Sequence, residues 1–238
     1  MGIPGNGYYL SGTLIVLYAI VPFFVAFEGR RPTAREIAVV AVLTALAVAA
    51  RAAFVWVPHF KPMAAIIMIA GIAAGPQTGF LVGSVAALAS NFIFGQGPWT
   101  PWQMFCWGLL GFLAGVLRKL GVFGPVGETE ANAKGRRPRP IALCVYGFLS
   151  GFLYGWIMNL YYIIGWVRPF SWKAAGAAYV SSFFFDLSHG VCTALVLWLV
   201  GEPWVRKLLR IKKKFGLTGE VRRYTLPPST KAPEGETL

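Results

Sequence analysis

Two ionisable side chains lie inside one long apolar stretch and could carry chemistry. Asp186 is the only acidic residue in the interior of any such stretch, and His189 follows three positions later. Residues three apart share a face of a helix, so we expect the carboxylate and the imidazole to be neighbours. Because an ionisable group inside a membrane-type segment is costly, it marks a candidate functional site. The pair could bind a ligand or carry a proton, or the two groups could simply satisfy each other or the backbone.

A second candidate is the segment 92–108, which joins two hydrophobic runs. Pro98 and Pro101 rule out one continuous helix here, because each lacks an N–H and restricts the residue before it. The segment carries these side chains that could stack on a ligand or hydrogen-bond to it: Gln96, Trp99, Thr100, Trp102 and Gln103. They are typical either of a ligand mouth, where flat rings and amides orient a substrate, or of an aromatic belt at the membrane surface.

Three further polar residues are expected near the same ends of their helices. Asn91, Asn159 and Tyr162 lie toward the ends of two hydrophobic runs, and a buried amide needs hydrogen-bond partners. We therefore include them in the predicted binding site. Arg51, near the end of another run, is expected to extend outward or to pair with Asp186.

The composition predicts an all-α membrane protein. Of the 238 residues, 56% are hydrophobic and only 13% are charged, about half the charged share of a soluble domain. Seven apolar runs are long enough to be helices, and the third is short for a full span of about 20 residues. The runs are 8–27, 37–57, 63–74, 78–94, 102–117, 141–166 and 174–200.

The distribution of basic residues predicts the topology. Eighteen of the 22 lysines and arginines lie in three segments, 30–35, 118–139 and 206–231, which seven spans place on one side of the membrane. The positive-inside rule makes that side the cytoplasm, so the N-terminus is expected outside and the C-terminus inside. Membrane topology and anionic lipid thus account for the net charge of +13, and we expect no nucleic-acid partner.

Motifs typical of enzymes are missing from the sequence. It has no P-loop, no HExxH, no GxSxG and no aspartate-rich repeat. The three cysteines stand alone in apolar runs and form no CxxC pattern. We therefore expect no catalytic residues, no metal site, no cofactor and no enzymatic activity.

Small residues form a stripe on the second hydrophobic run. Ala41, Ala45 and Ala49 are each four positions apart, which places them on one helical face. Another helix can approach such a face closely. The approaching helix could belong to this chain or to another membrane subunit.

Three stretches together resemble a known family: Arg35-Glu-Ile, Phe60-Lys-Pro, and Asn91-Phe-Ile-Phe-Gly-Gln-Gly-Pro-Trp-Thr-Pro-Trp-Gln-Met. They are similar to the substrate-binding S components of energy-coupling factor (ECF) transporters, which are bacterial vitamin importers. The resemblance implies a six-helix core at 35–201. An extra transmembrane helix and basic loop precede it at 1–34, and a basic tail follows at 202–238, its end expected to be disordered.

The resemblance also implies a function. An S component in the bacterial plasma membrane captures a vitamin at its outer face, associates with a transmembrane coupling subunit and two cytoplasmic ATPases, and releases the substrate inside. The alanine stripe would dock the coupling subunit. The string around Trp99 is similar to S components assigned to cobalamin, so a corrinoid is the first predicted substrate, although a flat heteroaromatic ligand fits equally.

Two other functions fit the same residues. A stand-alone secondary transporter could use Asp186 as its proton site. A small membrane enzyme could use Asp186 and His189 as acid and base.

Overall fold

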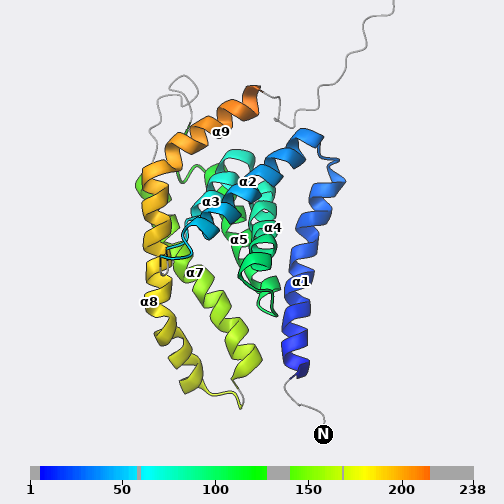
Figure 1. Ribbon diagram of the computed structural model, residues 1–238, viewed down its shortest axis with the longest axis vertical. Helices are drawn as coiled ribbons and strands as arrows, with labels where there is room; N and C mark the ends of the chain where they lie inside the picture. Colours follow the sequence, from blue (N-terminus) through cyan, green and yellow to red (C-terminus); the bar gives the residue numbers. More distant parts are fainter. Residues whose placement is uncertain (1–5, 58–59, 128–139, 168, 215–238) are drawn as a thin grey trace, which may run out of the picture.

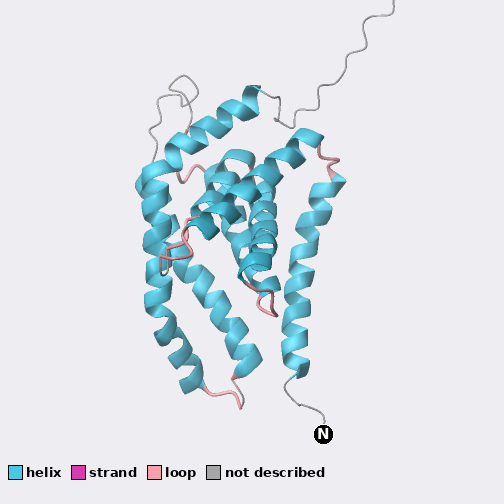
Figure 2. Ribbon diagram, in the orientation of Figure 1, coloured by secondary structure: helices cyan, strands magenta, loops and turns pink. Residues whose placement is uncertain are grey.

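The computed structural model describes residues 6–57, 60–127, 140–167 and 169–214, and every regular element in them is helical (Figures 1 and 2). The elements are α1 (Asn6–Gly29), α2 (Ala34–Ala53), α3 (Met63–Ala74), α4 (Pro76–Phe94), α5 (Thr100–Lys119), α7 (Pro140–Trp166), α8 (Trp172–Val196), a π-helical turn (Leu197–Gly201) and α9 (Glu202–Lys214).

By length and composition, six helices could cross a membrane. They are α1, α2, α4, α5, α7 and the long helix that starts with α8. The remaining apolar helix, α3, has only 12 residues and is buried along nearly its whole length. An apolar helix that is covered on all sides belongs to the centre of a bundle. The predicted all-α membrane bundle is thus confirmed.

Local sequence signals set the helix ends that position the core. Thr33 and Glu36 form a capping box at the start of α2, in which the Thr33 backbone N–H donates to Glu36 Oε2 over 2.8 Å. Gly75 ends α3 with a φ of 109°, and Pro76 begins α4 directly after it. Proline suits a first helical turn because the N–H that it lacks would have no intrahelical partner there.

Glycines allow α4 and α5 to pack backbone against backbone. A Cβ on Gly79 would overlap the Gly111 carbonyl, and one on Gly83 would overlap the Trp107 backbone. The α7–α8 pair uses the same device where Gly151 meets the Gly190 backbone. These glycines therefore serve helix contacts within this chain.

The extra N-terminal helix lies at the edge of the bundle, against α4, α5 and α7 (Figure 1). Val16 and Ile20 are buried in this contact. The Phe23 ring stacks on Phe80 with 3.7 Å between centroids. Because this contact closes over Trp102, α1 forms part of the packed structure.

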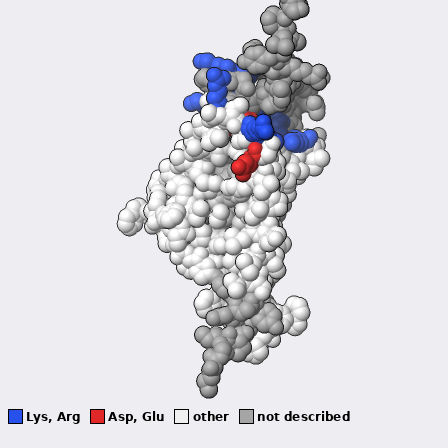
Figure 3. Space-filling view, turned by 90° about the vertical axis from the view of Figure 1, so that its right-hand side faces the viewer, with Lys and Arg blue, Asp and Glu red and all other residues white. Residues whose placement is uncertain are grey.

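The basic tail begins with a helix that the sequence reading did not predict. α9 crosses one end of the bundle and packs on α3, with Val205 fully buried (Figure 1). Its lysines and arginines lie at the end where basic side chains gather (Figure 3). The tail end that we expected to be disordered lies outside the described residues.

Candidate ligand-binding site

A narrow cavity lies among α3, α5, α7 and α8, next to Lys61 in the segment between α2 and α3. Its lining comprises Lys61, Met63, Ala64, Trp107, Leu110, Ser150, Gly151, Tyr154, His189 and Thr193. The Trp107 and Tyr154 rings are nearly parallel, 5.3 Å apart between centroids. Rings, hydroxyls, an imidazole and an ammonium thus face one space, which is typical of a small-molecule site.

In this conformation the cavity is nearly closed. Its volume is only about 20 Å³, whereas sites for drug-sized ligands usually enclose about 300–1,000 Å³. A vitamin-sized ligand can therefore enter only if part of the wall moves. Lys61 belongs to the connection between α2 and α3, so this part of the cavity wall lies outside the helices.

Four of the predicted site residues form one hydrogen-bonded cluster. The Asn91 amide donates to Thr100 Oγ1 over 3.0 Å and to Gln103 Oε1 over 2.8 Å. Thr100 donates to Gln96 Oε1 over 2.9 Å. Gln103 then donates to the Tyr154 hydroxyl over 3.1 Å, which connects the cluster to the cavity wall. The sequence thus predicted residues that lie together, behind the cavity rather than in it.

Arg51 completes this cluster from α2. Its guanidinium donates to Ser90 Oγ and, over 2.9 Å, to Asn91 Oδ1. It also lies 4.6 Å from the Phe94 ring centroid and 4.9 Å from that of Trp107. The expected pair with Asp186 is not among the ion pairs of the described residues, because α4 supplies the partners of Arg51 instead.

Neither of the two tryptophans predicted to contact the ligand lines the cavity. Trp102 is 7% exposed and packs toward Tyr161 and α1, on a different face of α5 from Gln103. Its indole N–H has no hydrogen-bond partner among the described residues. Trp99 is 38% exposed and covers Gly97 in the turn before α5. A ligand-stacking role for either ring remains a prediction.

Asn159 and Asp186 meet between α7 and α8. The Asn159 amide donates to Ser182 Oγ over 2.8 Å, and Ser182 donates to Asp186 Oδ2 over 3.1 Å. Asp186 is only 2% exposed and lies against Gly155, where any Cβ would overlap the carboxylate. Tyr162, by contrast, is exposed on the outer surface of α7.

His189 is the one predicted site residue that lines the cavity. Its ring lies 4.2 Å from that of Phe185 and 6.1 Å from that of Tyr154, measured between centroids. The sequence reading missed the other polar lining residues. Lys61 carried a usable signal, because it is one of the few basic residues outside the predicted cytoplasmic segments. Ser150, Tyr154 and Thr193 carried no such signal.

The Lys61 ammonium is in an unfavourable environment for a cation. Partial burial lowers its pKa, and the positive charge of Arg51 lowers that pKa further. In the described parts of the chain, no group of three metal-ligating side chains converges here or elsewhere.

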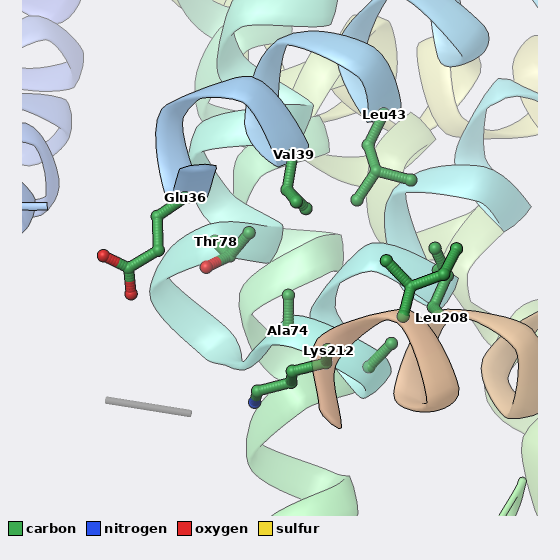
Figure 4. Close-up of a pocket in the computed structure, with 9 residues that line it drawn as sticks. Glu36, Val39, Leu43, Ala74, Thr78, Leu208 and Lys212 are labelled. Atoms are coloured by element: carbon green, nitrogen blue, oxygen red, sulfur yellow. The ribbon is translucent and has the colours of Figure 1, made fainter. Parts of the chain in front are cut away.

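A second pocket lies under α9, at the basic end of the bundle (Figure 4). It is lined mainly by apolar side chains of α2, α3 and α9, such as Val39, Leu43 and Leu208. The polar ends of Glu36 and Lys212 point away from this lining (Figure 4). None of the predicted site residues reaches this pocket, and no polar groups converge in it, so it is a weaker candidate for an oriented ligand.

The alanine stripe faces outward. Ala41, Ala45 and Ala49 are exposed and lie in a shallow groove between α2 and α4. Val85, Ala89 and Ile93 form the opposite wall of the groove. The stripe therefore makes no close contact with another described helix of this chain and leaves room for a helix from outside it.

Comparison with known proteins gives one match. Residues 32–124 match the family model described as "ECF-type riboflavin transporter, S component". No curated protein and no solved structure matches the chain. The matched segment runs from the cap of α2 past the end of α5 and includes Lys61, the Asn91 cluster and Trp107. It supports the ECF S-component family and a vitamin-transporting membrane subunit, and it gives no support to the cobalamin branch.

Proposed function

We propose that this chain is the substrate-specific subunit of an ECF-type importer and binds a planar vitamin in the cavity beside Trp107 and Tyr154. The family match carries this proposal. The matched segment contains α2, which carries the exposed alanine stripe, and part of the cavity wall. It therefore contributes to both surfaces that an S component needs, a docking surface and a ligand-binding site.

A flat heteroaromatic substrate suits the cavity better than the corrinoid predicted from the sequence. The family model is that of a riboflavin transporter. The cavity walls offer two nearly parallel rings, against which a planar ligand can stack once the wall opens. Ser150, His189 and Thr193 supply polar groups at the edge of these rings and would fix the ligand's orientation.

In this proposal other subunits supply the energy for uptake, which is consistent with a sequence that contains no P-loop. A transmembrane coupling subunit would place a helix in the groove along Ala41, Ala45 and Ala49, and two cytoplasmic ATPases would bind to that subunit. The plasma membrane is the proposed location, with the C-terminus in the cytoplasm. The basic side chains at the α9 end support this orientation (Figure 3).

Binding and uptake measurements test the proposal together. The full chain in lipid nanodiscs should bind riboflavin in calorimetry and should not bind cobalamin. Cells that also express a coupling subunit and both ATPases should accumulate riboflavin, and an ATPase variant without a functional P-loop lysine should abolish the uptake.

Three outcomes would contradict the proposal. Cobalamin binding without riboflavin binding would restore a corrinoid as the predicted substrate. Uptake by proteoliposomes that contain this chain alone, driven by a proton gradient, would indicate a secondary transporter with Asp186 as proton site. Chemical conversion of a bound substrate by the purified chain would indicate an enzyme that uses Asp186 and His189.

A further inference from the structure

The surroundings of the cavity contain more positive than negative charge. Lys61 lies in the cavity wall, and Arg51 lies directly behind Trp107. Asp186 is the only acidic residue between Glu130 and Glu202, and its carboxylate accepts a hydrogen bond from Ser182. No ion pair of the described residues joins it to either cation.

Arg51 is positively charged, as a guanidinium always is in proteins, and the groups that contact it are neutral. It is 7% exposed, its hydrogen-bond acceptors are the Ser90 hydroxyl and the Asn91 amide, and two aromatic faces cover it. Its Nε has no hydrogen-bond partner among the described residues. These contacts solvate the guanidinium without neutralising it, so its positive field reaches the cavity across Trp107.

Lys61 is the cation that a ligand can reach. Its side chain is partly buried, lines the cavity, and pairs with no carboxylate in the described parts of the chain. A partly buried ammonium near a second cation is stabilised by an anion that can accept its hydrogen bonds. The cavity contains no such anion of its own, since its other polar lining groups are hydroxyls and an imidazole.

We propose that Lys61 binds an anionic group, a carboxylate or a phosphate, on the planar ligand that stacks beside Trp107 and Tyr154. The inference rests on the proposed function, which supplies a planar ligand that enters this cavity. It adds a substrate class: acidic derivatives of a heteroaromatic vitamin should bind more tightly than the uncharged parent. Arg51 acts as a positioning residue that holds Trp107 and adds a favourable field.

Calorimetry with three flavins tests the proposal on the full chain in nanodiscs. Flavin mononucleotide carries a phosphate, 10-carboxymethylflavin carries a carboxylate, and riboflavin is uncharged. At least one acidic flavin should bind about tenfold more tightly than riboflavin, as expected for one charge-assisted hydrogen bond. The stronger of the two identifies the anionic group.

Substitutions then assign the preference to Lys61. Lys61→Met should remove the preference for the acidic flavin, whereas Lys61→Arg should retain most of it. Lys173→Met is the matched control, because Lys173 is exposed at the start of α8 and is not among the cavity residues. Equal affinities for all three flavins, unchanged by Lys61→Met, would overturn the inference and leave the proposed function intact.

A measurement without flavins keeps the test independent of the vitamin's identity. Lysines are labelled as ¹³C-dimethyl-lysine, and the Lys61 resonance is assigned by its loss in Lys61→Arg. Phenyl phosphate or benzoate should shift this resonance, and uncharged benzyl alcohol should not. A shift without flavin binding would refute the flavin substrate and support the anion site. The absence of any shift with either anion would refute the anion site.

Discussion

At the scale of single residues, the structure separates side chains that the sequence places together. Gln103 and Trp102 are neighbours in the chain, but Gln103 hydrogen-bonds to Tyr154 on the cavity side and Trp102 packs toward α1. Consecutive residues on a helix point about 100° apart, so one of them can serve a site while the other serves packing. Trp107, five positions after Trp102, lines the cavity.

The two tryptophans should therefore respond differently to the same substitution. We expect Trp107→Phe to weaken ligand binding up to about tenfold, because an indole that stacks on a ligand contributes about 0.5–1.5 kcal/mol beyond its area. Trp102→Phe should leave affinity unchanged and lower the melting temperature instead. Calorimetry and thermal unfolding of both variants measure the two effects, and an affinity loss confined to Trp102→Phe would support the ligand mouth predicted from the sequence.

A second prediction concerns the buried carboxylate. Asp186→Asn keeps the size of the side chain and an acceptor for the Ser182 hydroxyl, so the chain should fold normally. We expect ligand affinity to fall several-fold, because Asp186 lies against Gly155, next to the cavity residue Tyr154. Calorimetry on folded Asp186→Asn measures the effect, with Ser182→Ala as the comparison. Unchanged affinity would restrict Asp186 to a role in α7–α8 packing.

At the scale of elements, α2 combines two surfaces. One end contributes Arg51 to the buried cluster behind the cavity, and the outward face presents the alanine groove. Arg51, Asn91, Gln103 and Tyr154 form a continuous hydrogen-bonded chain from α2 to the cavity wall. We therefore expect a movement of α2 on docking to change the geometry of the ligand site.

Filling the groove should block transport while binding survives. We expect Ala45→Trp to abolish uptake in cells that carry the coupling subunit, because an indole would occupy the space that a partner helix needs. Val42→Trp is the matched control, since Val42 is exposed on the same helix and is not among the groove residues. Ligand affinity of both purified variants should equal that of the parent. Normal uptake by Ala45→Trp would exclude this groove as the docking surface.

α9 stabilises the bundle through its buried apolar side. Val205→Asp would place a carboxylate where Val205 is fully buried, and burial of an unpaired charge is strongly unfavourable. We expect a melting temperature lower by at least about 5 °C, which corresponds to roughly 1–3 kcal/mol for a chain of this size. Lys207→Asp, at an exposed position of the same helix, should change it little. If both variants melt at the parent's temperature, α9 does not contribute to the stability of the core.

At the scale of the whole molecule, basic residues mark one end of the bundle, and the start of α8 lies at the other (Figure 1). The described lysines and arginines of α9 and of the end of α5 gather at one end (Figure 3). Lys173 lies in the first turn of α8, at the opposite end of that helix from the α9 junction. The positive-inside rule places the basic end in the cytoplasm.

Cysteine labelling in intact cells tests this orientation. In a variant without the three native cysteines, Lys173→Cys should react with a membrane-impermeant maleimide and Lys119→Cys should not. Both positions are exposed, so accessibility to solvent does not favour either of them. After the membrane is permeabilised, both should react. The reverse pattern in intact cells would invert the topology.

Much of the fold followed from the order of residues alone. The apolar runs, the capping box at Thr33 and Glu36, and the break at Gly75 and Pro76 are local signals, and each marks a helix or a helix end in the structure. The sequence assigned Asn91, Gln96, Thr100 and Gln103 to one predicted binding site, and the structure joins these four side chains by hydrogen bonds. α9 was missed because the segment was interpreted as a basic tail, although Val205, Leu208 and Leu209 recur at helical spacing between its basic residues.

The site itself depended on contacts between distant parts of the chain. Lys61, Trp107, Tyr154 and His189 come from four segments, and nothing local to any of them indicates that they share one cavity. Helix rotation and crossing decide which side chains face inward, and these depend on packing across the bundle, such as the glycine contacts of α4 with α5. For the same reason Arg51 hydrogen-bonds to Ser90 and Asn91, which α4 brings next to it, and not to Asp186.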